Sequence, residues 1–521
     1  MKVLLINAPF PFEESPTPPL GLMSLAGYLL REGIEVIIED YIIQPYSRER
    51  VRRILREFRP DVVGATAVTM NVKKALSILK EFREEDPSPA TVMGGPHVSF
   101  DAEEILKNNP SVDYIVRGEG ELSFAELLGR LGDGNDLSDV KGVSYRGGDC
   151  VIHNEDRPLI PDINILPGPA RHLVPLSRYR ALGFPVSMVT SRGCPYNCIF
   201  CVGSRMVGRK VRNFDVGRVV DEFEELSRMG FVQINIVDDL FTANQARCME
   251  ICDEILRRGI VHSWGAFARV DSVSPRLLEK MKKAGCTALC FGIESGDQAI
   301  LDRIKKKTTL AKCHEAARIT REAGIEPMMS FILGLPGETA ETARTTMEFA
   351  RTLSTNYGFH VLAPFPGTEV RDRAGEYGMK VLTDDWDLYD ANHAVMDPGS
   401  IAPEEVERLA NWYVNGITEY IDELEPRKAR GEILSESDER ALQGVRAFRF
   451  NRALILDEMI ERYPGIADGG RRDAVLPDLV DYLERSIAIG RDEINDQLQR
   501  LVNLKCIVLC DDALGARVRW T

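Results

Sequence analysis

The chain has 521 residues, of which 44% are hydrophobic and 28% are charged. That length predicts about three domains of ordinary globular composition. The net charge of −15, from 65 basic and 80 acidic residues, argues against a nucleic-acid partner, because phosphate backbones bind to basic surfaces. No apolar run reaches the length of a membrane span, and the 11 cysteines show no disulfide framework. We therefore expect a cytoplasmic protein without a membrane span.

Residues 1–130 alternate short apolar runs with amphipathic helical stretches. Apolar runs at 3–6, 36–38, 62–65, 91–93 and 114–116 are separated by helical patterns at 20–32, 48–58, 72–85, 101–108 and 121–130. This alternation predicts an α/β fold, a doubly wound parallel sheet of Rossmann-like type. Ligands of such sheets bind beyond the carboxyl ends of the strands.

The loops at those carboxyl ends are rich in glycine and proline. They include Pro18-Pro19-Leu20-Gly21, Gly94-Gly95-Pro96-His97 and Arg117-Gly118-Glu119-Gly120-Glu121. Paired glycines allow the backbone to approach a bulky ligand closely. Each loop taken alone is also compatible with a simple turn or helix cap.

A cysteine triplet follows the next predicted strand. Residues 191–203 read Ser-Arg-Gly-Cys-Pro-Tyr-Asn-Cys-Ile-Phe-Cys-Val-Gly, a C-x3-C-x2-C spacing formed by Cys194, Cys198 and Cys201. Thiolates are the natural ligands of iron–sulfur clusters, and three of them leave one iron of a four-iron cubane open. Zinc needs a fourth ligand nearby, whereas the next Cys or His is Cys248. We therefore expect a [4Fe-4S] cluster held by the triplet.

Six further strands are predicted downstream of residue 185, at 186–190, 232–237, 264–268, 288–292, 328–333 and 359–362. With the helices between them they predict a partial (β/α)6 barrel, whose chemistry lies at the carboxyl ends of the strands. Those ends carry Asp238-Asp239, Arg269 and Glu294-Ser295. Such residues also cap helices, but their repetition at strand ends favours a ligand site.

These motifs closely resemble the radical S-adenosylmethionine (SAM) superfamily. The resemblance implies that the open iron binds the amino and carboxylate groups of SAM. One electron from the cluster then cleaves the sulfonium to a 5′-deoxyadenosyl radical. It also implies SAM contacts at five residues: Phe200, Asp239, Arg269, Glu294 and Ser295.

The N-terminal loops resemble the cobalamin-binding domain that precedes the barrel in cobalamin-dependent radical SAM enzymes. The resemblance implies cobalamin contacts at Pro9, Phe10, Gly21, Thr66, Thr69, Met70, Gly94, Gly95, His97, Glu119 and Gly120. None of the 7 histidines lies in a D-x-H-x-x-G motif, so the lower face of cobalt is not expected to be bound through that motif. We expect His97 to contact the nucleotide tail and not cobalt.

After residue 400 the sequence becomes charged and helical, at 403–424, 437–461 and 476–504. We expect four parts: a cobalamin-binding domain (1–145), a linker (146–185), the barrel (186–370) and a mainly helical region (371–521). The family parallel implies that the last part covers the barrel mouth and selects the substrate. Cys506-Ile-Val-Leu-Cys510 is interpreted as a buried strand and not as a second metal site.

The resemblance implies a cobalamin-dependent radical SAM C-methyltransferase, which moves a methyl group from SAM through methylcobalamin to an unactivated carbon. The substrate is a peptide, a protein or a small molecule, and we favour a peptide or protein side chain, such as a glutamine of methyl-coenzyme M reductase. An electron donor such as ferredoxin or flavodoxin is implied. Alternatives are a cyclase or oxidase of tetrapyrrole or natural-product biosynthesis, a cobalamin sensor or carrier, and a radical enzyme whose N-terminal domain has lost cobalamin. No catalytic side chain is assigned.

Overall fold

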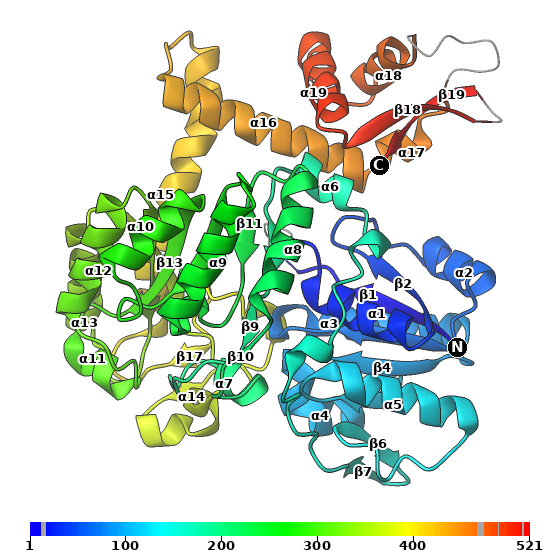
Figure 1. Cartoon of the computed structure of the whole chain (residues 1–521), viewed down its shortest axis with the longest axis horizontal. Helices are drawn as coiled ribbons and strands as arrows, with labels where there is room; N and C mark the ends of the chain where they lie inside the picture. Colours follow the sequence, from blue (N-terminus) through cyan, green and yellow to red (C-terminus); the bar gives the residue numbers. More distant parts are fainter. Residues whose placement is uncertain (12–16, 466–473, 488, 513–514) are drawn as a thin grey trace.

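The computed structural model describes residues 1–11, 17–465, 474–487, 489–512 and 515–521. An N-terminal α/β part lies beside a barrel-like part, and a helical C-terminal region projects from them (Figure 1). Among the described residues, no helix combines the length and the apolar character needed to cross a membrane.

The N-terminal part is built on a seven-stranded sheet in the order β2-β1-β3-β4-β5-β6-β7. Its first five strands are parallel: β1 (Lys2–Asn7), β2 (Glu35–Asp40), β3 (Val62–Thr66), β4 (Ala90–Gly94) and β5 (Tyr114–Val116). The helices are α1 (Leu20–Arg31), α2 (Arg48–Glu57), α3 (Val72–Glu85), α4 (Pro96–Asn108) and α5 (Gly120–Asp133). A short 3₁₀ turn, η1 (Thr69–Asn71), follows β3.

Alternating side chains of this sheet enter two different cores. Val3 and Leu5 pack with residues of α1 and α5, whereas Leu4 and Ile6 pack with residues of α2, α3 and α4. Since successive strand residues point to opposite faces, helices cover both faces of the sheet. The predicted doubly wound fold is confirmed.

The sheet continues past residue 145, where sequence analysis ends the domain. Strands β6 (Val143–Gly147) and β7 (Cys150–His153) form an antiparallel hairpin that adds to β5. The signal was present, because the intervening Gly148-Asp149 is typical of a tight hairpin turn. Helix α4 begins at Pro96 and not near residue 101, as expected for proline in the first turn of a helix.

The segment after the hairpin contains the short elements η2 (Ile163–Ile165), η3 (Arg171–Leu173) and α6 (Leu176–Ala181). It leads into the second sheet, ordered β15-β14-β13-β12-β11-β8 with parallel neighbours. These strands are β8 (Val186–Met188), β11 (Ile234–Ile236), β12 (Trp264–Ala268), β13 (Cys286–Glu294), β14 (Glu326–Leu333) and β15 (Asn356–Val361).

Helices lie on one face of this second sheet and leave the other face concave. They are α8 (Val216–Arg228), α9 (Gln245–Arg257), α10 (Pro275–Lys283), α11 (Gln298–Arg303), α12 (Leu310–Glu322) and α13 (Ala340–Thr352), with the turn η4 (Phe241–Ala243). The Trp264 ring packs edge-on against Phe223 and Phe241 on the helical side. The predicted six-stranded partial barrel is confirmed.

The cysteine loop and a later segment lie together at the carboxyl ends of the barrel strands. The loop contains β9 (Ser191–Arg192), α7 (Gly203–Met206) and β10 (Arg212–Asn213). The later segment contains α14 (Glu369–Asp372), η5 (Ala374–Tyr377), β16 (Lys380–Val381), η6 (Trp386–Leu388) and β17 (Met396–Asp397). Val370 N–H donates to the Ile199 carbonyl at 3.0 Å, which ties the two together.

The remaining C-terminal elements are α15 (Pro403–Ala429), α16 (Glu436–Leu456), α17 (Met459–Arg462), α18 (Val475–Glu484), α19 (Arg491–Asn503) and a hairpin of β18 (Ile507–Asp512) with β19 (Gly515–Trp520). The mainly helical character is confirmed, although 476–504 forms two helices. Cys506 is buried next to β18, and Cys510 is half-buried on it.

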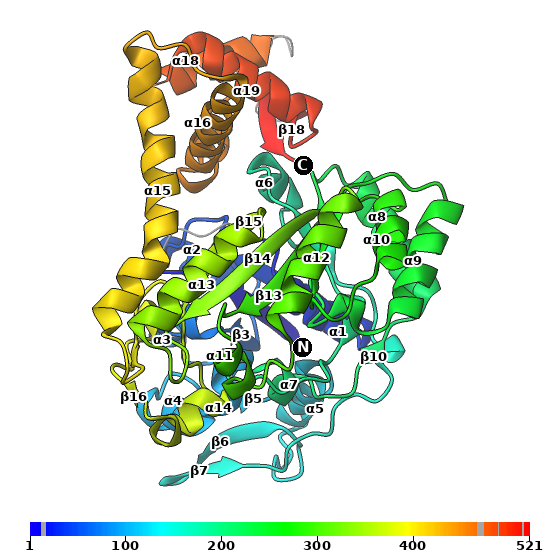
Figure 2. The same ribbon diagram turned by 90° about the vertical axis from the view of Figure 1, so that its left-hand side faces the viewer.

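Helices α16, α18 and α19 do not cover the barrel mouth, whereas α15 begins near it, since a Cβ on Gly334 after β14 would lie 3.2 Å from Val406. In both views α16, α18 and α19 lie at the opposite end of the barrel from α7 (Figures 1 and 2). Asn451 of α16 donates to the Ala181 carbonyl, just before the first barrel strand. Segment 363–397 lies at the mouth. Part of it shares a hydrophobic cluster with Ile199 of the cysteine loop, and another part packs with Met70 of the N-terminal part.

Candidate functional site

The cysteine loop is closed at its base by backbone pairing. Arg192 and Arg212 are register partners of the β9–β10 pair, and Cys194 N–H donates to the Gly208 carbonyl at 3.1 Å. Gly193 has a φ of +109°, and a Cβ there would lie 2.5 Å from the Lys210 carbonyl oxygen. Glycine is therefore required before the first cysteine, because the backbone there is left-handed and the Lys210 carbonyl comes close to it.

The three thiols of this loop suit iron–sulfur ligation. Gly203 N–H points at Cys201 Sγ at 3.4 Å, and hydrogen bonds to the sulfurs stabilise and tune such clusters. Desolvation raises the pKa of each thiol, so protons are released when the thiolates bind iron. Among the residues that the structure describes, no three Cys, His, Asp or Glu side chains converge on a single metal ion.

Asp239 lies beside this loop. Its Oδ2 accepts the Gly193 N–H at 3.0 Å, and a Cβ on Gly203 would lie 3.1 Å from its Oδ1 and 3.4 Å from Cys201 Sγ. Asp238 instead turns into the protein and accepts hydrogen bonds from Thr190 and Ser191. Of the two predicted carboxylates, Asp239 is thus the one next to the cysteine ligands.

Arg269 contacts the cysteine loop through Tyr196. Its guanidinium lies 3.6 Å from the centroid of the Tyr196 ring, forms a bidentate pair with Asp271 at 3.0 and 3.1 Å, and donates to the Lys306 carbonyl at 2.6 Å. Most of its donors are used within the protein. The structure therefore gives Arg269 a positioning contact with Tyr196 between the first two cysteines.

Glu294 is held in an unusual backbone conformation at the end of β13. The register shifts between Gly292 and Glu294, and Glu294 has a φ of +76°. Such strain at a non-glycine residue is typical of functional sites. A Cβ on Gly292 would lie 2.4 Å from Glu294 Oε1, so the bulge turns this carboxylate back over the concave face.

The partner of Glu294 is Lys306, which sequence analysis missed. Their side chains are both 7% exposed and pair at 2.6 Å between Nζ and Oε1. The same ammonium lies 5.9 Å from the Phe200 ring centroid. Phe200, Glu294 and Lys306 thus come together beside the cysteine loop, where a ligand with both an ammonium and a carboxylate meets one group of each charge.

Ser295 lies away from this cluster of groups. It is fully buried, contacts Thr346 of α13 at 3.2 Å, and accepts the Asp297 N–H at 3.1 Å. In this structure its hydroxyl caps a turn and packs on a helix.

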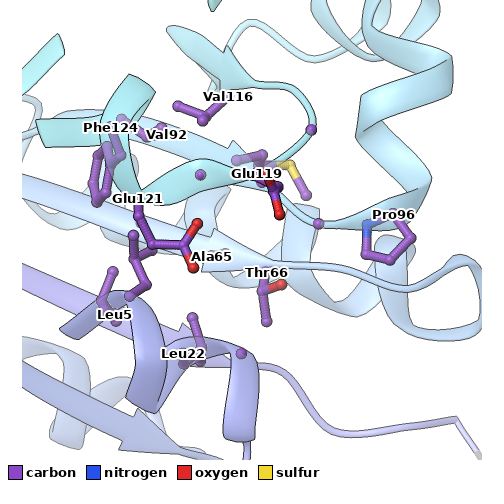
Figure 3. Close-up of a pocket in the computed structure, with 18 of the residues that line it drawn as sticks. Leu5, Leu22, Ala65, Thr66, Val92, Pro96, Val116, Glu119, Glu121 and Phe124 are labelled. Atoms are coloured by element: carbon purple, nitrogen blue, oxygen red, sulfur yellow. The ribbon is translucent and has the colours of Figure 1, made fainter. Parts of the chain in front are cut away.

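A cavity of about 370 Å³ opens at the carboxyl edge of the N-terminal sheet. Figure 3 shows Thr66, Pro96, Glu119 and Glu121 around it, with the apolar side chains of Leu5, Leu22, Val92, Val116 and Phe124. Six of the eleven residues expected to contact cobalamin line it: Gly21, Thr66, Gly94, Gly95, Glu119 and Gly120.

The lining of the cavity is compatible with an apolar group, and the nucleotide tail of cobalamin carries one in its base. Its wall is mostly apolar, and its size is that of ordinary ligand pockets. Gly95 has a φ of +102°, and a Cβ there would lie 2.6 Å from the Ala67 carbonyl oxygen. Only glycine keeps this edge of the cavity open without strain.

The other five expected residues lie outside this cavity. Met70 packs against the mouth segment in a cluster with Tyr389. His97 is buried, with its Nδ1 3.1 Å from Thr69 Oγ1 and its ring 4.9 Å from the Trp386 ring. Pro9 and Phe10 do not line the cavity either. His97 therefore does not line this cavity, and its contact with the nucleotide tail stays a prediction.

Two residues of the cysteine loop, Met206 and Val207, complete the cavity wall together with Arg192. Arg192 binds Glu119 and Glu121 at 2.9 and 2.5 Å. Arg192, Met206 and Val207 were not among the site residues predicted from the sequence. The Ser-Arg-Gly-Cys string carried Arg192 next to the first cysteine, but nothing in the pattern showed that it faces the other domain.

The concave face of the barrel carries an apolar row below the Glu294–Lys306 pair. Phe267, Cys290 and Met328 are register neighbours on β12, β13 and β14. Phe267 is 48% and Met328 is 49% exposed. These neighbouring apolar side chains offer a surface on which the apolar part of a ligand can pack.

Two family models match the chain in the order of these sites. The B12 binding domain matches residues 14–128, and the radical SAM superfamily matches residues 188–350. A Pyrococcus horikoshii protein named an uncharacterized methyltransferase is 36% identical over 395 residues, which are 75% of this chain and 86% of that protein. The anaerobic magnesium-protoporphyrin IX monomethyl ester cyclase of Rubrivivax gelatinosus is 30% identical over 487 residues, which are 90% of this chain and 79% of the cyclase.

A solved structure shares the whole arrangement of parts. The cobalamin-dependent SAM radical enzyme OxsB, with aqua-cobalamin and SAM bound, superposes with a TM-score of 0.69 at 17% identity, over 96% of this chain and 83% of OxsB. The likeness supports the fold described above.

The chain belongs to the cobalamin-dependent radical SAM enzymes. Within them it is an iron–sulfur methyltransferase whose cofactors are a [4Fe-4S] cluster, SAM and cobalamin.

Proposed function

We propose that this enzyme methylates an unactivated carbon of its substrate. When bound, the cluster with SAM supplies a hydrogen-abstracting radical, and cobalamin supplies a methyl carrier. The observation that carries the proposal is that Met206 and Val207 of the cysteine loop form part of the cavity expected to hold the cobalamin tail. Both cofactors would then act on one substrate position, as a radical methyl transfer requires.

The protein groups at the barrel mouth orient and shield the reactants. Glu294 and Lys306 offer a buried carboxylate and ammonium, which suit the amino and carboxylate groups of SAM through charge-assisted hydrogen bonds. Asp239 accepts the Gly193 N–H next to Cys194, and Arg269 packs on Tyr196. These residues would keep SAM and the cluster in a fixed relation.

For the acceptor we propose a peptide or protein side chain, with a glutamine of methyl-coenzyme M reductase as the example to test. The half-exposed Phe267 and Met328 support an acceptor whose apolar part packs on the concave face. Because this row is open, one side chain can enter while the rest of a macromolecule stays outside.

A small reduced protein such as ferredoxin or flavodoxin is the proposed electron donor. Cys201 is exposed, which supports electron entry from that side of the loop. We also propose a cytoplasmic location, supported by all 11 cysteines being free thiols, as in reducing compartments.

The test is an anaerobic reaction of reconstituted enzyme with SAM, a reductant and a synthetic glutamine-containing peptide, followed by mass spectrometry. Methylation adds the mass of CH2 to the peptide, and methyl-deuterated SAM moves the label into it. A product without label contradicts the proposal.

Oxidative ring closure is the second candidate, because the Rubrivivax gelatinosus cyclase aligns with 90% of this chain. In the same assay with magnesium-protoporphyrin IX monomethyl ester, cyclisation gives a product without a transferred methyl label. Formation of that product and no labelled peptide would replace the leading proposal.

A further inference from the structure

The cysteine loop is fastened at both of its ends to one carboxylate of the other domain. Arg192 and Arg212, the register partners at its base, bind the two oxygens of Glu119 at 2.9 and 2.8 Å. Glu119 also accepts the Ile160 N–H at 2.9 Å. A single side chain after β5 therefore holds together the two strands that enclose all three cysteines.

This contact is buried and fully charged. The side chains of Glu119 and Arg212 are 6% and 5% exposed, and Arg192 also binds Glu121 in the first turn of α5. Burial acts to raise the pKa of Glu119, but hydrogen bonds from Arg212, Ile160 and Arg192 outweigh it and lower the pKa. The positive charges of two arginines thus offset the negative charges of two glutamates inside the protein.

The same residues form the cavity expected to hold the cobalamin tail. Glu119, Glu121 and Arg192 line it, and the loop adds Met206 and Val207. Arg212 fixes this part of the loop by donating to the Val207 carbonyl at 2.8 Å. A group that fills the cavity therefore touches the N-terminal sheet on one side and the cysteine loop on the other.

We propose that the Arg192–Glu119–Arg212 contact, with Glu121, couples cluster assembly to cobalamin binding. Binding of metal orders the loop that carries its ligands, and an ordered loop presents the finished cavity wall. Cobalamin then binds more tightly, because its binding no longer has to supply the entropy cost of ordering this wall. By thermodynamic reciprocity, bound cobalamin increases retention of the cluster to the same extent.

This coupling does not depend on which carbon is methylated, or on whether the product is a methylated or a cyclised one. It concerns only the two cofactors and the residues between them. Failure of the peptide assay would leave it intact, and its own failure would leave methyl transfer untouched.

The experiment measures the dissociation constant of hydroxocobalamin by anaerobic equilibrium dialysis, using full-length protein with and without a reconstituted cluster. We expect the cluster to tighten binding about tenfold, within the usual range of such couplings. The loss of iron to a chelator is measured in parallel, and this loss should be slower when hydroxocobalamin is present. Equal dissociation constants for the two wild-type forms overturn the proposal.

Variants identify the residue that carries the coupling. Arg192→Met should bind hydroxocobalamin equally with or without the cluster, while retaining iron in the reconstituted form. Arg192→Lys keeps the charge but cannot reach both glutamates with one planar fork, so part of the difference should remain. A tenfold difference that persists in Arg192→Met contradicts the assignment.

Arg171→Met is the matched control. Arg171 forms another buried pair, with Glu222 at 2.5 Å, and does not line the cavity. It should keep the full cluster dependence of cobalamin binding. Loss of the dependence in this variant would assign the effect to general destabilisation and overturn the role of Arg192. If Arg192→Met does not fold, Glu121→Gln tests the same contact and should also reduce the difference.

Discussion

The two candidate cofactor sites lie at the carboxyl ends of two parallel sheets, yet they are built differently. At the N-terminal sheet, glycines and apolar side chains leave a space, as at Gly95, where any Cβ would strike the Ala67 carbonyl. At the barrel, the site is formed instead by buried charged side chains, as in the Glu294–Lys306 pair. The first site suits a group with a large apolar part, bordered by the charges of Glu119, Glu121 and Arg192, and the second suits a small ligand with formal charges.

The difference predicts different responses to substitution. A site formed by an open space should fail when a side chain with added volume enters that space. A site made of charges should fail when one partner is removed, because the other remains buried and unpaired. The following experiments test this distinction, beginning with the largest effect.

Removal of a cysteine should abolish the barrel site completely. We expect Cys198→Ala to lose the cluster and all cleavage of SAM, since three thiolates are needed to leave only one iron open. Iron and sulfide per chain and 5′-deoxyadenosine formation measure this. Cys150→Ser, on the exposed hairpin strand β7, is the control and should keep both. A Cys198→Ala protein with a normal cluster would refute the assignment.

Removal of the Lys306 charge should weaken SAM binding strongly. Lys306→Met leaves the Glu294 carboxylate buried alone, which lowers the free energy of unfolding by about 3 kcal/mol. We also expect SAM affinity to fall by about tenfold or more, measured by equilibrium dialysis. The double variant Lys306→Met/Glu294→Gln should recover stability but not SAM affinity. Recovery of both would mean that the pair is structural.

Added volume at Gly95 should damage the other site. Gly95→Ala forces a left-handed alanine against a carbonyl oxygen, a strain of about 1–3 kcal/mol, and should weaken hydroxocobalamin binding by about tenfold. Gly129→Ala, on helix α5 with no atom near its Cβ, should instead stabilise the helix by up to about 1 kcal/mol. Unchanged cobalamin affinity in Gly95→Ala would remove this cavity from the site.

The smallest expected effect concerns Glu338 near the end of β14. Burial raises its pKa to about 7, although hydrogen bonds from Gly334 and Leu335 act in the opposite direction. Between about pH 4.5 and 7, Glu338 is therefore protonated in the folded state but ionised in the unfolded state. The free energy of unfolding falls as pH rises through this range.

Between pH 6 and 7 the free energy of unfolding should fall by about 1 kcal/mol from this group. Glu338→Gln should remove that part of the pH dependence, as measured by urea unfolding at several pH values. An unchanged slope would show that Glu338 titrates normally.

The sequence was sufficient for the fold because hydrophobic periodicity determines it. The apolar runs at 3–6 and 264–268 became β1 and β12, and their alternating side chains enter different environments. The cysteine spacing was equally informative, since it is local. The hairpin β6–β7 was missed although its turn signal was present, because the parallel pattern before it suggested that the sheet had ended.

The partners of the site residues were harder to predict, because they come from distant parts of the chain. Lys306 lies in the run Lys305-Lys306-Lys307, which is typical of an exposed surface. Its two neighbours both have positive φ values, and this backbone path buries the middle side chain. Arg192 and Glu119 are separated by 73 residues, and no periodicity relates them. His97 follows a motif glycine pair but turns under Trp386.

The bulge in β13 separates two demands on one strand. Because Ile293 is the extra residue between Gly292 and Glu294, the strand supplies a carboxylate to the mouth without shifting Leu289 or Phe291, which remain fully buried. The side chain at position 294 can therefore be exchanged during evolution without a change in the packing of Leu289 and Phe291 against the helices. An engineer who wishes to alter the chemistry of this barrel can begin at the residue inserted before Glu294.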